Sequence, residues 1–136
     1  MSVLDNALQA LFTMAHKEIL WENASPASSF ADQTITLTAL ADYDAVIIQF
    51  GNSTNIPDTT SYQIFVKNKS GYAVTWSNLQ AKTTLYVRSR IVDVNAANIF
   101  FGDCYAHATT DQSTPVQNGF AIPQTVYGLK LSGGGQ

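Results

Sequence analysis

The sequence predicts an all-β domain: an antiparallel β-sandwich or jelly roll of about eight strands, preceded by a short helix. Short apolar or alternating segments recur with turn residues roughly every ten positions, as is typical of sandwiches. No helical segment separates these strands, which argues against a parallel α/β sheet. The chain of 136 residues with 46% hydrophobic content is enough for one domain with a sizeable core.

The first sixteen residues have helical rather than strand periodicity. Leu4, Leu8 and Leu11 recur at helical spacing. Ser2 can cap the start, with Asp5 three positions later in the pattern of a capping box. A helix this short is marginal by itself and needs a surface to pack on. That surface is either the β domain of the same chain, or a larger assembly on which the three leucines dock or trimerise.

The domain prediction follows from this change of pattern. Residues 1–16 form a docking or oligomerisation segment, residues 17–131 form the β-sandwich, and residues 132–136, with their run of glycines, form a flexible tail.

A hairpin is predicted near the start of the β domain. Residues 34–40 alternate strictly, with Ile35, Leu37 and Ala39 on one face. Residues 41–44 supply the turn. Residues 45–50 form a nearly continuous β-branched run, as expected for a strand covered on both faces.

Further strands are predicted at 61–67, 72–76, 83–94, 98–106 and 125–131. The strand over 83–94 has two clearly different faces. We expect its inward side chains to be Leu85, Val87, Ser89, Ile91 and Asp93. Its other face carries Tyr86, Arg88, Arg90 and Val92.

The charge pattern limits the class of partner. Only 12% of residues are charged and the net charge is −3, so no basic surface for nucleic acid or anionic membrane is expected. No apolar run is long enough to span a bilayer. A chain so poor in charge is suited to burying part of its surface against other subunits.

No catalytic or metal-binding motif stands out. Cys104 and His107 could share a zinc ion, but a structural zinc site needs four ligands. Positions 104 and 107 point to opposite faces of a strand, which also argues against a nucleophile–base pair. We therefore predict a non-enzymatic protein with no metal and no cofactor, in which Cys104 is a small buried strand residue.

Three residues form a possible ligand-facing group. Tyr72 and Trp76 lie on one predicted strand, next to the amide of Asn78. Exposed aromatic rings beside amides can bind sugars, whereas aromatic side chains four positions apart on one strand face can equally fill the core. The loops at 51–60, 68–71 and 109–119 are the other candidates for a ligand-facing rim.

Five segments together resemble a domain of bacteriophage structural proteins. They read LWENASPASSF at 20–30, QTITLTAL at 33–40, DAVIIQF at 44–50, FFGDCYA at 100–106 and IPQTVYGLKL at 122–131. In order and spacing they are similar to the domain that often ends tail, baseplate or head fibers of phages of Gram-positive and gut bacteria.

The resemblance implies a virion protein, either a fiber or a capsid decoration protein, that functions in host-surface attachment. It also implies a homotrimer whose partners are other virion proteins and host cell-surface carbohydrate. Family members commonly end a long fiber, whereas residues 1–16 are too few for a shaft, so a stand-alone version with a short docking helix is expected. The family's motifs name no receptor-contacting residues, so none is transferred here.

Overall fold

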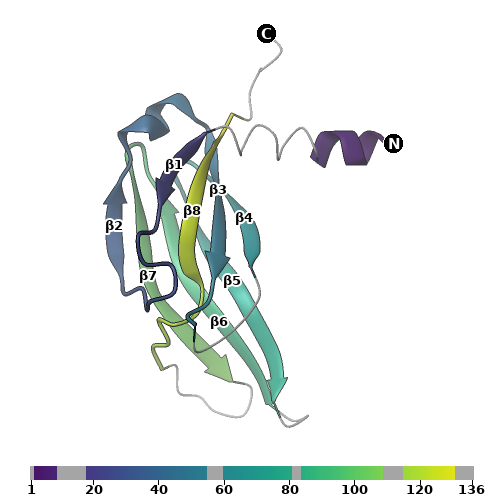
Figure 1. The fold of residues 1–136 in the computed structure, drawn as a ribbon, viewed down its shortest axis with the longest axis vertical. Helices are drawn as coiled ribbons and strands as arrows, with labels where there is room; N and C mark the ends of the chain where they lie inside the picture. The colour runs from purple at the N-terminus through teal and green to yellow at the C-terminus, as the bar shows by residue number, and fades with distance from the viewer. Residues whose placement is uncertain (1, 9–17, 55–59, 81–83, 109–114, 131–136) are drawn as a thin grey trace.

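The computed structural model describes residues 2–8, 18–54, 60–80, 84–108 and 115–130, and of residues 72, 74–80, 84 and 86 it describes the backbone alone. The described part contains two four-stranded antiparallel sheets that pack face to face (Figure 1). The fold is therefore all-β and sandwich-like, as predicted.

The first sheet, called the front sheet because it faces the viewer in Figure 1, has the strand order β1-β8-β3-β4. Its strands are β1 (Ile19–Glu22), β8 (Ile122–Leu129), β3 (Ala45–Gly51) and β4 (Ser61–Val66). The second sheet, called the back sheet, has the order β2-β7-β6-β5. Its strands are β2 (Gln33–Thr36), β7 (Asn98–Ala108), β6 (Thr84–Val94) and β5 (Lys69–Gln80).

The core lies between the two sheets. β3, an inner strand of the front sheet, contributes three of its side chains. Val46, Ile48 and Phe50 of β3 are fully buried in the main hydrophobic cluster. Ala45 and Ile47 are also buried, in a second cluster with Tyr127 and Leu129 of the neighbouring β8. The prediction of a strand covered on both faces is confirmed.

The predicted hairpin between residues 34–40 and 45–50 is wrong. β2 pairs with β7 in the back sheet, whereas β3 pairs with β4 and β8 in the front sheet. A 3-10 helix at Thr38–Asp42 carries the chain from one sheet to the other. This helix breaks the alternation, so Leu40 is buried and Ala39 is exposed.

The predicted orientation of β6 is also wrong. Arg90 and Val92 are completely buried and Arg88 nearly so, whereas Leu85 is exposed. Val87, Ser89, Ile91 and Asp93, all expected inside, lie on the half-exposed outer face. The inward orientation is possible because the guanidinium of Arg90 finds backbone carbonyl partners inside the sandwich, which offset its loss of water.

The segments that resemble the phage domain meet around three aromatic rings. Phe30 and Phe101 make an edge-to-face contact with centroids 5.6 Å apart, and Trp21 lies 6.3 Å from Phe30. The side chain of Asn23 donates to the carbonyl of Pro123 over 2.9 Å. These segments therefore build the packing of the sandwich.

The N-terminal helix begins as predicted. The backbone N–H of Asp5 donates to Ser2 Oγ over 3.1 Å, and the carboxylate of Asp5 accepts from the backbone N–H of Ser2. Residues 3–8 are helical. Leu4 and Leu8 remain 67% and 48% exposed, so neither is packed into the core of the β domain. Leu11 lies outside the described residues.

Candidate functional site

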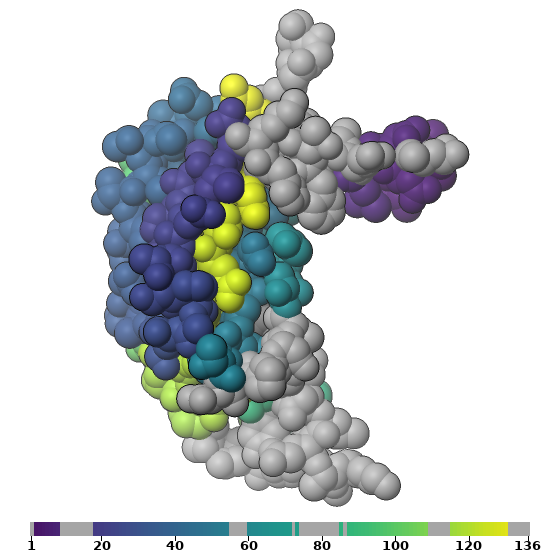
Figure 2. All heavy atoms as spheres, in the orientation of Figure 1, coloured from purple at the N-terminus to yellow at the C-terminus, as the bar shows by residue number. Residues whose placement is uncertain are grey.

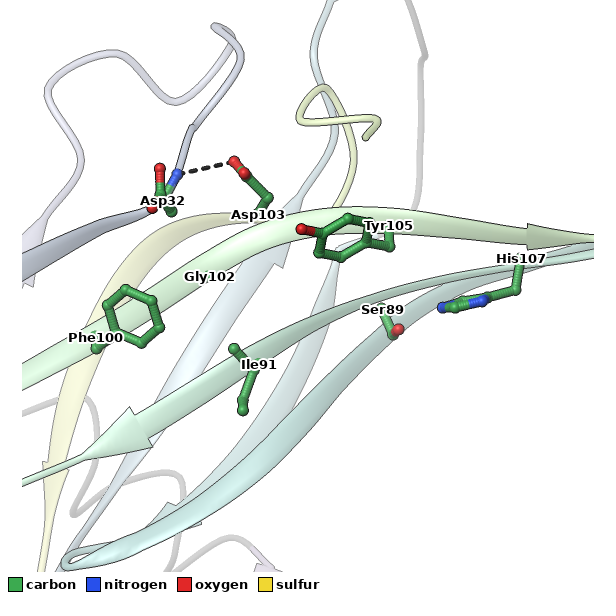
Figure 3. A pocket seen from close by; sticks show the side chains of 8 residues that line it. All are labelled: Asp32, Ser89, Ile91, Phe100, Gly102, Asp103, Tyr105 and His107. Atoms are coloured by element: carbon green, nitrogen blue, oxygen red, sulfur yellow. Dashed lines mark hydrogen bonds between the residues drawn. The ribbon is translucent and has the colours of Figure 1, made fainter. Parts of the chain in front are cut away.

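A groove lies on the outer face of the back sheet, within the described structure (Figure 3). Its volume is about 500 Å³. It is lined by Asp32, Ser89, Ile91, Phe100, Gly102, Asp103, Tyr105 and His107. Ser89 and Ile91 come from β6, and five of the others come from β7.

A β-bulge in β7 shapes this groove. Arg90 pairs with Cys104 and Val92 pairs with Phe101, so Ile91 alone faces two residues, Gly102 and Asp103. The bulge places both of these residues beside the groove, while Phe101 and Cys104 remain buried in the interior. Bulges often redirect side chains beside functional sites in this way.

Glycine at position 102 leaves room for Ile91. A Cβ added at Gly102 would lie only 2.5 Å from Ile91 Cγ2, well inside van der Waals contact. The side chain of Ile91 therefore packs over the glycine backbone and forms an apolar part of the groove.

Arg90 holds the bulge from the buried side. Its Nη1 donates to the carbonyl of Gly102, its Nε donates to the carbonyl of Ala121 over 2.9 Å, and its Nη2 donates to the carbonyl of Phe120 over 3.4 Å. Burial lowers the pKa of the guanidinium from its ordinary value. The three bonds connect the bulge to the segment that leads into β8.

Asp103 is fixed at the rim by one of its two carboxylate oxygens. Oδ1 accepts the backbone N–H of Asp32 over 3.0 Å and the side-chain amide of Asn118 over 2.7 Å. Asn118 Oδ1 in turn accepts the backbone N–H of Cys104 over 2.7 Å. Among the described residues none donates to Asp103 Oδ2, so this oxygen is available to a ligand.

The other polar side chains of the groove also lack protein partners within the described part of the chain. The side chains of Asp32, Ser89, Tyr105 and His107 make no hydrogen bond to another described residue. Of the described residues that line the groove, none is a lysine or arginine. The groove thus combines two carboxylates, hydroxyl groups and an imidazole with apolar rings, and its described lining carries no fixed positive charge.

Cys104 is buried beneath the groove, as predicted, and His107 is exposed on the groove side. The two side chains therefore cannot form a nucleophile–base pair. In the described ranges, no group of three or more histidine, cysteine, aspartate or glutamate side chains is placed to hold a metal ion. Burial raises the pKa of the Cys104 thiol to about 11, so the thiol is protonated at neutral pH.

This raised pKa predicts a specific loss of stability at high pH. The unfolded chain releases the thiol proton near pH 9 and the folded chain only near pH 11, so the free energy of unfolding falls as pH rises through this window. We expect the stability difference between the native protein and Cys104→Ala to shrink by about 2 kcal/mol between pH 8 and pH 11. Urea unfolding across this range measures it, and a constant difference would contradict the prediction.

The residues predicted to face a ligand lie on the same sheet as the groove. Tyr72, Trp76 and Asn78 are on β5, where their backbones pair with Ile91, Arg88 and Tyr86 of β6. Their side chains lie outside the described part of the structure. Parts of two candidate loops, residues 55–59 and 109–114, are outside it too.

Sequence reasoning missed the groove because it sought ligand residues on loops and around Tyr72 and Trp76, whereas the groove is lined mainly by β6 and β7. The one available signal was Gly102 within a strand pattern, which is typical of a bulge. That signal gives the position of a bulge, but the side chains that surround it come from the pairing of β6 with β7 and from Asp32, far away in the sequence.

Comparison with known proteins adds no relative. No family model, curated protein or solved structure matches the chain. No described helix is both long and apolar enough to cross a membrane. The fold and the groove are therefore the observations on which a function can be based.

Proposed function

We propose that this chain is a non-enzymatic structural protein of a phage particle, a fiber or decoration protein displayed on the virion, and that it attaches to the host surface through the groove. The observation that carries the proposal is the groove itself. Its unpartnered polar side chains and aromatic rings are held on a sheet, and rigid sheets position ligand contacts better than loops do.

The sequence resemblance supports the phage assignment through the fold. The similar segments provide a cluster of three rings, in which Phe30 and Phe101 are buried and Trp21 is half-buried, and the bulge at Gly102. They therefore contribute to the packing between the sheets and to one wall of the groove. Within the sandwich we propose jelly-roll connectivity, which is supported by the repeated exchange of the chain between the two sheets, after β1, β2, β4 and β7.

A homotrimer is the proposed assembly, with other virion proteins as its further partners. The outer face of the front sheet supports self-association, because Ile19, Tyr62, Ile64 and Val66 expose large apolar side chains there. Figure 2 shows atoms of β1, β8 and β4 on this face. Light scattering of the full chain and of a variant lacking residues 1–16 tests both the trimer and the role of the helix.

Attachment is tested with one substitution in the groove and one outside it. Tyr105 lines the groove and is 43% exposed. Thr38, on the 3-10 helix between β2 and β3, is exposed and belongs neither to the groove nor to the apolar front-sheet face. We expect fluorescently labelled protein to bind host bacteria, Tyr105→Ala to reduce this binding roughly tenfold, and Thr38→Ala to leave it unchanged. Equal losses in the two variants, or no binding by the native protein, would refute attachment through the groove.

The alternative function is a monovalent, lectin-like carbohydrate-binding module that acts without a particle. The groove favours it equally, since the geometry of the groove does not depend on assembly. A monomer by light scattering, together with Tyr105-dependent cell binding, would favour this alternative over the trimeric virion protein.

A further inference from the structure

The charges of the groove select against anionic ligands. Asp32 and Asp103 contribute carboxylates, and the described lining contains no lysine or arginine. An anionic ligand would meet two like charges with no fixed cation to compensate, which is unfavourable in a partly desolvated site. A ligand rich in neutral hydrogen-bond donors is better matched.

The apolar part of the groove selects for a ligand with a flat, weakly polar face. Phe100, Tyr105 and Ile91 line the groove together with the polar groups (Figure 3). The C–H face of a pyranose ring packs on aromatic side chains, while its hydroxyl groups point outward at the edge. Sites with an apolar lining and a few placed polar groups are typical for small ligands of this kind.

The acceptor geometry fits hydroxyl donors. Asp103 is held by two hydrogen bonds to Oδ1, so Oδ2 is oriented without rotational freedom and costs little entropy to use. Asp32 lines the same groove, and its backbone N–H is one of those two donors. The two carboxylates can therefore accept from different hydroxyl groups of one glycan.

We propose that the groove binds a neutral glycan of the bacterial surface, with one sugar ring packed on Tyr105 and two of its hydroxyl groups donating to Asp103 Oδ2 and Asp32. Ser89 and His107 contact the next part of the glycan along β6 and β7. This inference rests on the proposed attachment function and adds the chemical class of the receptor.

The test uses the full chain on an array of bacterial surface glycans that includes neutral, anionic and amino-sugar members, with a polyarginine peptide as a cationic probe. We expect binding to neutral glycans. Tyr105→Ala should weaken it roughly tenfold, Asp32→Asn should weaken it about threefold, and Thr38→Ala, outside both the groove and the apolar front-sheet face, should leave it unchanged. Circular dichroism confirms that each variant is folded.

The outcomes separate the receptor class from the attachment function. Tyr105-dependent binding to cells without binding to any neutral glycan would overturn the neutral-glycan proposal and leave attachment intact. Preference for the anionic glycans or for the polyarginine peptide would overturn it in the same way. Absence of binding to both cells and glycans would overturn both proposals. Glycan binding that Tyr105→Ala does not weaken would show that the groove is not the site.

Discussion

Replacing Arg90 with methionine should lower the free energy of unfolding by roughly 3–5 kcal/mol, because three buried backbone carbonyls lose their donor together. Small domains are typically stable by about 5–15 kcal/mol, so the loss is a large fraction of the total. Methionine approximates the length of the stem, and the packing loss is therefore small beside the lost hydrogen bonds. Urea unfolding followed by circular dichroism measures the effect.

Arg88 provides the control, because it is on the same strand and the same face. Its Nε donates to Gln117 Oε1 over 3.1 Å, and its guanidinium lies 4.3 Å from the ring centroid of Phe120. Without Arg88, the side-chain amide of Gln117 can rotate toward solvent and form hydrogen bonds with water. Arg88→Met should therefore lower the free energy of unfolding by only about 1 kcal/mol. Similar losses at the two positions would show that Arg90 does not act through the three carbonyls.

Replacing Phe101 with alanine should be comparably destabilising, by about 3–5 kcal/mol. Phe101 is fully buried and contacts the rings of Phe30 and Trp21, so truncation removes apolar contacts and leaves a cavity between the sheets. Thermal or urea unfolding measures the loss.

Phe100 is the natural comparison for Phe101, since adjacent strand residues point to opposite faces. Phe100 is half-buried and lines the groove. Phe100→Ala should therefore lower the free energy of unfolding by about 1 kcal/mol and weaken glycan binding. Phe101→Ala should mainly lower the free energy of unfolding. If the two substitutions had the same effect on both properties, the assignment of the strand faces would be wrong.

Features that depend on local sequence were predictable. The nearly continuous apolar run at 45–50 puts apolar side chains on both faces of the strand, so both faces must be shielded from water. Both faces of β3 are buried in the structure. The capping pattern of Ser2 and Asp5 likewise depends on residues three positions apart. The all-β class follows from the same local periodicity.

Features that depend on distant partners were not predictable. The alternation of β6 predicts two faces, and hydropathy alone places the face with Arg90 in water. The carbonyls of Phe120 and Ala121 that accept its hydrogen bonds inside the sandwich are about thirty residues away in the sequence, so local patterns do not reveal them. The pairing of β2 with β7 instead of β3 has a similar origin, since a 3-10 helix replaced the expected turn. The groove was not predictable for the same reasons. It is formed by a bulge on β7 and by the face of β6 that was expected to point into the core.

The apolar outer face of the front sheet and the groove on the back sheet lie on opposite sides of the sandwich. An assembly that joins copies through the apolar face therefore leaves every groove pointing away from the shared axis. When one groove of such an assembly releases its sugar, the other grooves keep the protein at the surface and the free groove can bind again. The effective affinity for a surface covered with repeated sugars can therefore exceed that of one groove by roughly 10²–10⁴-fold. A shallow groove with weak individual affinity is then sufficient for durable adhesion, while each single contact stays readily reversible.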